Sequence, residues 1–148
     1  MEKMTPEKAG ACFAGGIDCS QVVFGHAAEQ IGMDKDEARR IAAAFGGGMW
    51  HGETCGCIAG ALMAIGYKYG HAQEGDQETK NVMLQKKAAF EEAFTAKRGS
   101  LICRELLGYD LSKPEELEKI MEENLLATLC PLLATEACGI LDELLAEK

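Results

Sequence analysis

The sequence lacks an excess of basic charge and a long apolar run. Its 15 Lys and Arg residues stand against 24 Asp and Glu residues, which gives a formal net charge of −9. Nucleic acids and anionic membranes favour basic surfaces, so we expect neither as the main partner. No apolar run approaches the roughly 20 residues that span a bilayer, so we expect no membrane insertion.

The opening residues, MEKMTPEKAG, also lack the apolar core of a signal peptide. We therefore expect a cytoplasmic protein, whose thiols are kept mostly reduced. Seven cysteines are many for that setting, and an odd number cannot all pair within one chain. A purely structural disulfide framework is thus disfavoured. Metal binding, redox chemistry or burial of cysteine as a small apolar residue remain.

Strand patterns are missing from the sequence, whereas helix start and stop signals recur along it. The connections between the expected helices are short, and 148 residues suit one domain. The sequence therefore predicts a compact all-α bundle of roughly six to eight helices in a single domain, residues 1–148. With the capping residue first, the expected helices run from Thr5 to Gly15, Asp18 to Ile31, Asp34 to the run Gly46–Gly48, Thr54 to Tyr69, Asp76 to Lys97, Ser100 to Gly108, Ser112 to Asn124, and onward from Cys130.

Four cysteines lie in the first turn of four of these helices: Cys19, Cys55, Cys103 and Cys130. A helix N-terminus carries unpaired N–H groups and about half a positive charge, which lowers the pKa of a thiol there. We therefore expect these residues to be ready thiolates, the form that attacks disulfides and binds metals. If the four helix ends point inward, they create a site for a negatively charged group such as a cluster with thiolate ligands.

The other cysteines carry weaker signals. Cys12 and Cys138 lie inside helical patterns near alanines and are interpreted as buried structural residues. Cys57 is ambiguous, because positions 55 and 57 lie about 200° apart on a helix and reach one centre only if the helix starts between them. His51, four residues before Cys55, is either an ordinary loop residue or a proton donor or extra ligand.

Glycine is placed where a helix should avoid it, since each interior glycine costs roughly 0.5–1 kcal/mol relative to alanine. Gly56, Gly60 and Ala64 are spaced four apart and form a stripe of small residues on one helix face. Such a stripe lets a neighbouring helix or a cofactor approach the backbone closely. A tight helix crossing without a cofactor fits the spacing equally well.

At these positions the chain resembles a family of redox-active proteins named for a C–GCAxxG–C–C cysteine pattern. The resemblance rests on four segments: DCSQVVF around Cys19, FGGGMWHGETCGCIAGALMAIGYKYG around Cys55, RGSLICRELLGYDL around Cys103, and CPLL at Cys130. It implies a small bacterial or archaeal protein with four shared cysteines and a redox role. It also implies a relationship to the cluster-bearing part of split-Soret cytochromes, which favours an iron–sulfur centre.

The chain departs from the family pattern at one point, where it reads TCGCIAG. Either Cys55 is the shared cysteine and Cys57 replaces an alanine, or Cys57 is the shared one and Ile58 replaces it. We favour Cys55, because it leads directly into the glycine stripe. Cys57 is then a spare thiol or a resolving thiol. A C-x-x-C-H motif is missing, so the chain carries no signal for covalent haem attachment.

Three functions follow, in order of preference. The first is electron transfer through an iron–sulfur cluster held by Cys19, Cys55, Cys103 and Cys130, with Cys57 and His51 as extra candidates. The second is metal-free thiol–disulfide chemistry, and the third is a Cys₄ zinc site with a structural or regulatory role. The acidic surface suits a basic redox partner protein, and a homodimer stays open. The residues provide no argument for catalytic turnover.

Overall fold

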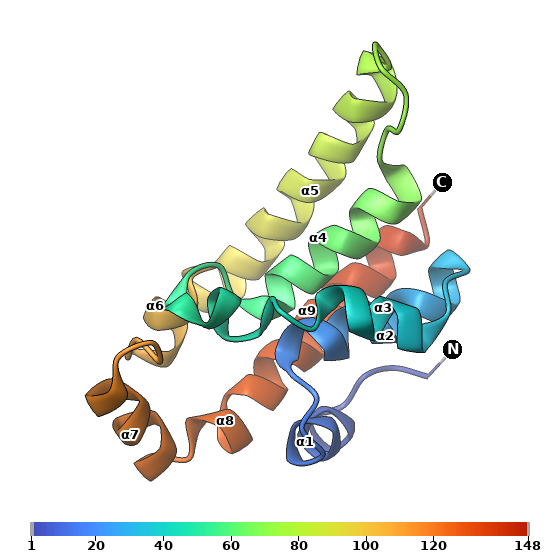
Figure 1. The fold of residues 1–148 in the computed structure, drawn as a ribbon. Helices are drawn as coiled ribbons and strands as arrows, with labels where there is room; N and C mark the ends of the chain where they lie inside the picture. Colours follow the sequence, from blue (N-terminus) through green and yellow to red (C-terminus); the bar gives the residue numbers. More distant parts are fainter. Residues whose placement is uncertain (1, 148) are drawn as a thin grey trace.

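The structure is a computed structural model that describes residues 2–147, and all its regular elements within that range are helices (Figure 1). Seven of the nine α-helices have at least seven residues, which confirms the prediction of an all-α fold. The elements are α1 (Pro6–Ala14), α2 (Cys19–Ile31), α3 (Lys35–Ala42), the turn η1 (Gly48–Gly52), α4 (Gly56–Tyr69), α5 (Gln77–Arg98), α6 (Cys103–Leu107), α7 (Pro114–Glu122), α8 (Leu125–Thr128) and α9 (Cys130–Leu145).

Helix α2 lies at the centre of the main core, where it packs against α3, α4 and α9. The apolar faces of α2, α4 and α9 bury residues such as Val23, Ile65 and Leu141 completely. Helix α5 covers α4 with Phe90 and Phe94, whose rings stack with centroids 6.3 Å apart. Helices α4 and α5 form a hairpin, and Figure 1 shows that its tip, the loop after α4 and the start of α5, extends beyond the other helices.

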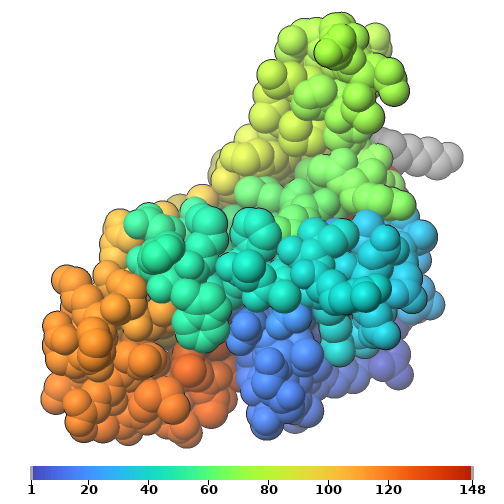
Figure 2. All heavy atoms as spheres, in the orientation of Figure 1, coloured from blue at the N-terminus to red at the C-terminus, as the bar shows by residue number. Residues whose placement is uncertain are grey.

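A second, smaller core holds α6, α7 and α8 together. Its fully or nearly buried members are Cys103, Leu107, Leu111 and Ile120. Figure 2 shows the orange atoms of this part beside the blue atoms of α1, with the teal and green atoms around η1 across the front. The chain therefore builds two apolar clusters, and the space between them is where the site lies.

The small-residue stripe of α4 packs against the backbone of α2, as the sequence predicted. A Cβ atom added to Gly60 would stand 2.5 Å from the carbonyl oxygen of Ser20, and one added to Gly56 would collide with Cys19 Sγ. Gly66 differs, because an added Cβ there would meet open space. Close approach of α2 thus explains Gly56 and Gly60, two of the three glycines of α4.

Four predicted caps are confirmed. Thr5, Asp34 and Asp76 each accept a hydrogen bond from the backbone N–H three residues on, and Asp18 forms a capping box with Gln21. These side chains satisfy N–H groups that the first turn of a helix leaves unpaired.

Three other predicted caps are wrong. The N-cap of α4 is Cys55 rather than Thr54, because Thr54 pairs with Ile102 in an isolated antiparallel bridge. Helix α6 starts after Ile102, and Ser100 accepts a hydrogen bond from the Ile102 N–H before that start. Ser112 does not cap α7, because its hydroxyl donates to the Asp110 carboxylate.

Two helix boundaries also differ from the prediction. Helix α3 ends at Ala42, several residues before the glycine run in which the sequence placed its end. The final helix begins with Cys130, so Leu129 and not Cys130 is its cap, and the short α8 precedes it. Helices α2, α4, α6 and α9 still begin at or immediately after the four cysteines that the sequence placed at helix starts.

One segment of the described chain, Leu125–Leu145, is long and apolar enough to cross a membrane by length and composition alone. The expectation that no segment reaches this length is therefore wrong for residues 125–145. In the fold, Leu133, Ala137 and Leu141 of this segment lie in the main core. Two of its acidic residues have partners in the fold: Glu136 forms an ion pair with Arg98, and the Asp142 carboxylate lies 2.9 Å from His26 Nε2.

Candidate functional site

A cavity of about 130 Å³ lies between the two apolar clusters, and five cysteines border it. The rest of its wall is mostly leucine, isoleucine and phenylalanine from α1, α6, α7, α8 and α9 and from the loops beside them. An engineered apolar cavity of ~150 Å³ stays dry and takes a molecule the size of benzene. The five cysteines on this cavity are Cys19, Cys55, Cys57, Cys103 and Cys130.

Three of these thiols lie near one another. Cys19 Sγ lies directly against the bare backbone of Gly56, and the thiols of Cys55 and Cys57 are near enough to lower the pKa of Cys19. Helix α4 begins at Gly56, between Cys55 and Cys57. That start meets the condition set by the sequence for both cysteines to reach one centre.

The bridge between Thr54 and Ile102 fixes a fourth thiol beside them. Cys55 N–H donates to the Leu101 carbonyl at 2.8 Å, and Cys103 N–H donates to the Glu53 carbonyl at 2.6 Å. These two hydrogen bonds hold the segments before α4 and α6 side by side. Cys55 and Cys103 therefore face the same cavity although α4 and α5 separate them in sequence.

The turn η1 forms part of the cavity wall in a strained conformation. Gly47, Gly48, Met49 and Trp50 all have φ near +60°, which is left-handed backbone. A non-glycine residue in this region costs roughly 1–2 kcal/mol, so Met49 and Trp50 are held there by their surroundings. Trp50 borders the cavity although its side chain is 49% exposed.

Two contacts fix this strained turn in place. The guanidinium of Arg104, on α6, donates to the Gly52 carbonyl at 3.1 Å. Gly47 borders the same cavity as Cys19, and its backbone N–H helps to lower the pKa of the Cys19 thiol. Strain of this kind is typical of functional sites.

The protonation of the thiols differs from the prediction. Hydrogen bonds from Cys55 and Cys57, and from the backbone N–H groups of Gly47 and Ser20, lower the pKa of Cys19 well below its usual value of 9.0. The same contact with Cys19 raises the pKa of Cys55 and of Cys57. Cys19 is therefore the thiolate that its two neighbours stabilise.

The remaining two cavity cysteines are also harder to ionise than expected. Burial raises the pKa of Cys103 to about 12 and that of Cys130 to about 12, and the nearby charge of Cys19 adds to both. The expectation of four ready thiolates thus holds for Cys19 alone. Loss of hydration in an apolar cavity outweighs the favourable field of a helix N-terminus.

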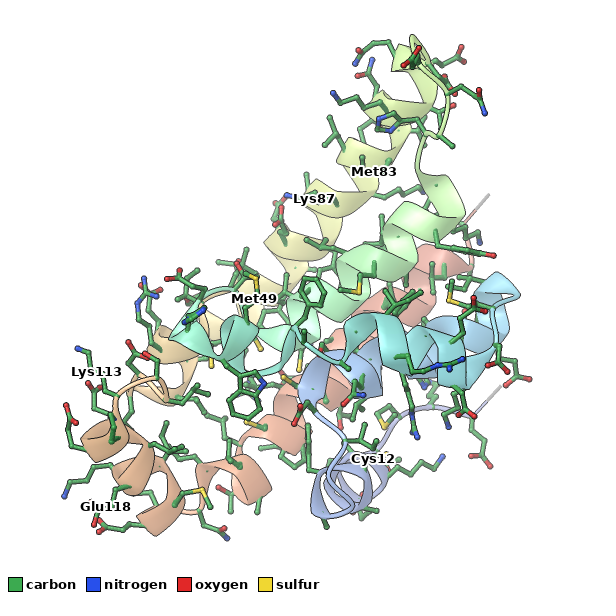
Figure 3. All side chains as sticks on the ribbon, in the orientation of Figure 1. Cys12, Met49, Met83, Lys87, Lys113 and Glu118 are labelled. Carbon is green, nitrogen blue, oxygen red and sulfur yellow. The ribbon has the colours of Figure 1, made fainter. Side chains whose placement is uncertain are left out.

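Several candidate residues lie outside the cavity. Figure 3 shows Cys12 on α1, apart from the sulfur atoms that gather where α2 and α4 begin. Cys138 is fully buried in the main core, as the sequence predicted. His51 is exposed on η1 and is not part of the cavity wall. His26 Nε2 lies 2.9 Å from the Asp142 carboxylate, which gives this histidine a role in packing.

The donor set suits a group with several thiolate ligands. Among residues 2–147, no three or more His, Cys, Asp or Glu side chains are arranged to hold a single metal ion. The five thiols instead surround a small apolar volume. Cysteine thiolates in fours hold [2Fe–2S] and [4Fe–4S] clusters, so the residues present fit such a cluster in number and in chemistry.

The fold and the site define an all-helical protein with a cysteine-lined cavity. The chain belongs to the family described as "Putative redox-active protein (C_GCAxxG_C_C)", whose model matches residues 17–144. No curated protein and no solved structure matches the chain. The family match confirms the resemblance inferred from the cysteine segments, while the relation to split-Soret cytochromes stays a prediction.

Sequence reasoning missed two parts of the site. The bridge of Thr54 with Ile102 leaves no local pattern, because it joins residues on either side of the α4–α5 hairpin. The left-handed turn does leave a signal in the run Gly46–Gly48, since consecutive glycines favour positive φ. Its extension through Met49 and Trp50 runs against the preference of both residues.

Proposed function

We propose that this redox-active family member transfers electrons through an iron–sulfur cluster held by Cys19, Cys55, Cys103 and Cys130. One observation carries the proposal: four cysteines that begin four separate helices border a single apolar cavity. Thiol exchange would need only two of these cysteines, whereas a cluster needs four.

The surroundings of these cysteines support the proposal. When bound, a cluster supplies one-electron chemistry at a potential set by its hydrogen bonds and its exposure to solvent. The pKa of Cys19 lies well below its usual value, chiefly through the neighbouring thiols and further through the backbone N–H groups of Gly47 and Ser20, so negative charge on this sulfur is stabilised. Six leucine side chains line the cavity, so the thiols face a mostly apolar space.

The charge of the protein supports a basic partner. The formal net charge is −9, and α7 carries acidic residues at Glu115, Glu116, Glu118 and Glu122. Complementary charge speeds the encounter of two proteins and orients them. We therefore propose a redox partner with a basic docking surface, whose rate of electron exchange falls as salt concentration rises.

The test begins with full-length protein purified without oxygen. A visible spectrum is recorded, and iron, sulfide and zinc are measured per chain. Broad visible absorption with stoichiometric iron and sulfide is the expected result. Cys103→Ser should lose both, whereas Cys138→Ser, at a buried cysteine away from the cavity, should keep them.

Two other outcomes would replace the proposal. Stoichiometric zinc without iron would indicate the Cys₄ zinc protein that the sequence left open as its third function. A colourless protein that stays metal-free after reconstitution with iron and sulfide would leave thiol–disulfide chemistry as the redox function.

A further inference from the structure

Cys57 has no role in a cluster with four cysteine ligands, yet its side chain is placed as closely as theirs. It has no exposed surface and borders the cavity. Its thiol lies near those of Cys19 and Cys55, and both neighbours raise its pKa. Cysteine so close to another cysteine is positioned for reaction between the two sulfur atoms as well as for packing.

The backbone around Cys57 brings it near Cys19. A disulfide needs Cα atoms usually 4.4–6.8 Å apart, so the two chain segments must approach closely. Helices α2 and α4 do so at this point: a Cβ added to Gly56 would stand 3.0 Å from the Ser20 nitrogen and would collide with Cys19 Sγ. Ser20 follows Cys19, and Gly56 precedes Cys57, so the two cysteines flank the closest approach.

We propose that Cys19 and Cys57 form a reversible disulfide, which gives the site a two-electron redox couple in addition to any bound group. Cys19 is half-buried on the cavity wall, whereas Cys57 is covered. Of these two cysteines, Cys19 is therefore the one that an incoming reagent meets first, and Cys57 completes the reaction from inside. The reagent class is a small uncharged disulfide, because the cavity is narrow and mostly apolar.

The reaction balances as two thiol–disulfide exchanges. The Cys19 sulfur attacks the small disulfide, forms a mixed disulfide and releases one small thiol. The Cys57 sulfur then attacks Cys19 Sγ, breaks the mixed disulfide and releases the second small thiol. The protein loses two electrons and two protons, and the small disulfide gains them.

The disulfide has a consequence that rests on the proposed function. It removes Cys19 from the four cysteines that would hold a cluster, so the oxidised chain should take up no iron until it is reduced. The disulfide itself does not depend on metal. The two proposals can therefore fail separately.

The experiment uses full-length protein treated with a chelator and a reductant, then freed of both under nitrogen. It is incubated with 2-hydroxyethyl disulfide, unfolded, alkylated with iodoacetamide and digested with trypsin. The expected product joins peptide 9–35 to peptide 41–68, lighter than the two free peptides by two hydrogen atoms. Fragmentation should place the link between Cys19 and Cys57.

Variants and iron uptake complete the test. Cys57→Ala should lose the link, whereas Cys12→Ala, which changes the other cysteine of peptide 9–35, should keep it. The proposal would be overturned by a link within peptide 41–68, by a link from Cys19 to Cys55, or by mixed disulfides alone. Each of these products can be detected in the protein of unchanged sequence, so the test does not depend on a variant that folds. If the reduced protein takes up no iron but the disulfide between Cys19 and Cys57 forms, the cluster proposal fails and the disulfide proposal stands.

Discussion

The two halves of α4 use glycine in opposite ways. In the first half, Gly56 and Gly60 lie against the backbone of α2, where an added Cβ would collide with Cys19 or Ser20. In the second half, Gly66 faces open space and the next residue, Tyr67, is 54% exposed. The same residue type is therefore required at one end of the helix and dispensable at the other.

The contrast extends to the neighbours of each half. The first half contacts α2 beside the thiol-lined cavity, whereas the second half has mainly α5 and the end of α9 beside it. Figure 3 shows the side chains of Met83 and Lys87 on the part of α5 that extends along the hairpin. Close packing is concentrated where the cysteines meet, which indicates that the fold holds the site more firmly than the hairpin.

The largest loss of stability is expected from Gly60→Ala, in the half of α4 that packs closely against α2. The new Cβ would stand 2.5 Å from the Ser20 oxygen and 3.2 Å from the Phe24 nitrogen, both backbone atoms that cannot turn away. Overpacking of this kind costs typically 1–3 kcal/mol, so we expect the free energy of unfolding to fall by about 2–3 kcal/mol. Urea denaturation measures it, and an unchanged midpoint would show that α2 and α4 separate easily.

A smaller loss is expected from Ser20→Ala, in the same region. Ser20 is fully buried, and its hydroxyl donates to the Ala42 carbonyl at 2.8 Å, which ties α2 to the end of α3. The Ala42 carbonyl also accepts from the Phe45 N–H at 3.0 Å and keeps that partner, so the loss of the Ser20 hydrogen bond should cost about 1 kcal/mol. Thr135→Ala is the control, because the Thr135 hydroxyl bonds only to its own helix at Pro131. Equal losses in the two variants would contradict the prediction.

Gly66→Ala tests the other half of α4, where we expect the substitution to raise the stability of the protein rather than lower it. No atom lies within 4 Å of the new Cβ, and φ at Gly66 is not in the left-handed region. Alanine in a helix interior is favoured over glycine by about 0.5–1 kcal/mol, so we expect this variant to be more stable by that amount. Thermal unfolding monitored by circular dichroism measures the gain, and a loss would place a hidden contact at this position.

The smallest change in stability is expected from Asp76→Ala, at the tip of the hairpin, where Asp76 caps α5. Hydrogen bonds from Thr79 lower the pKa of the Asp76 carboxyl below 3.8. A lowered folded-state pKa contributes stability that is complete above the unfolded value and is lost as pH falls through the folded value. Asp76→Ala should therefore be less stable than the unchanged chain at pH 7, and the difference should shrink below pH 4. Urea denaturation at several pH values measures the difference in the free energy of unfolding, and a difference that does not change with pH would contradict a role for the ionised Asp76 carboxylate.

The helices were predictable where one local signal decides their ends. Thr5, Asp18, Asp34 and Asp76 cap the helices that the sequence assigned to them, because each bonds to an N–H group only three residues away. Thr54 failed as a cap because its backbone pairs with Ile102 beyond the hairpin. Local propensity carries no information about such a partner.

Sequence position singled out four of the five cysteines that border the cavity, but it did not predict their ionisation. Position at a helix start identified Cys19, Cys55, Cys103 and Cys130, and all four border one cavity. Their ionisation depends on burial and on contacts between thiols, which only the folded chain defines. The close contact of Cys57 with Cys19 likewise follows from the meeting of α2 and α4, which sequence spacing alone did not determine.

The bridge of Thr54 with Ile102 closes the base of a loop that contains the whole of α4 and α5. Cys55 and Cys103 are set by that closure, so their positions do not depend on the length of the chain between α4 and α5. Lengthening a loop adds little entropic cost, and exposed loop tips accept inserted sequence. The exposed tip at residues 71–75 is thus a point at which evolution, or an engineer, can add a peptide or a domain while the cysteine-lined cavity keeps its shape.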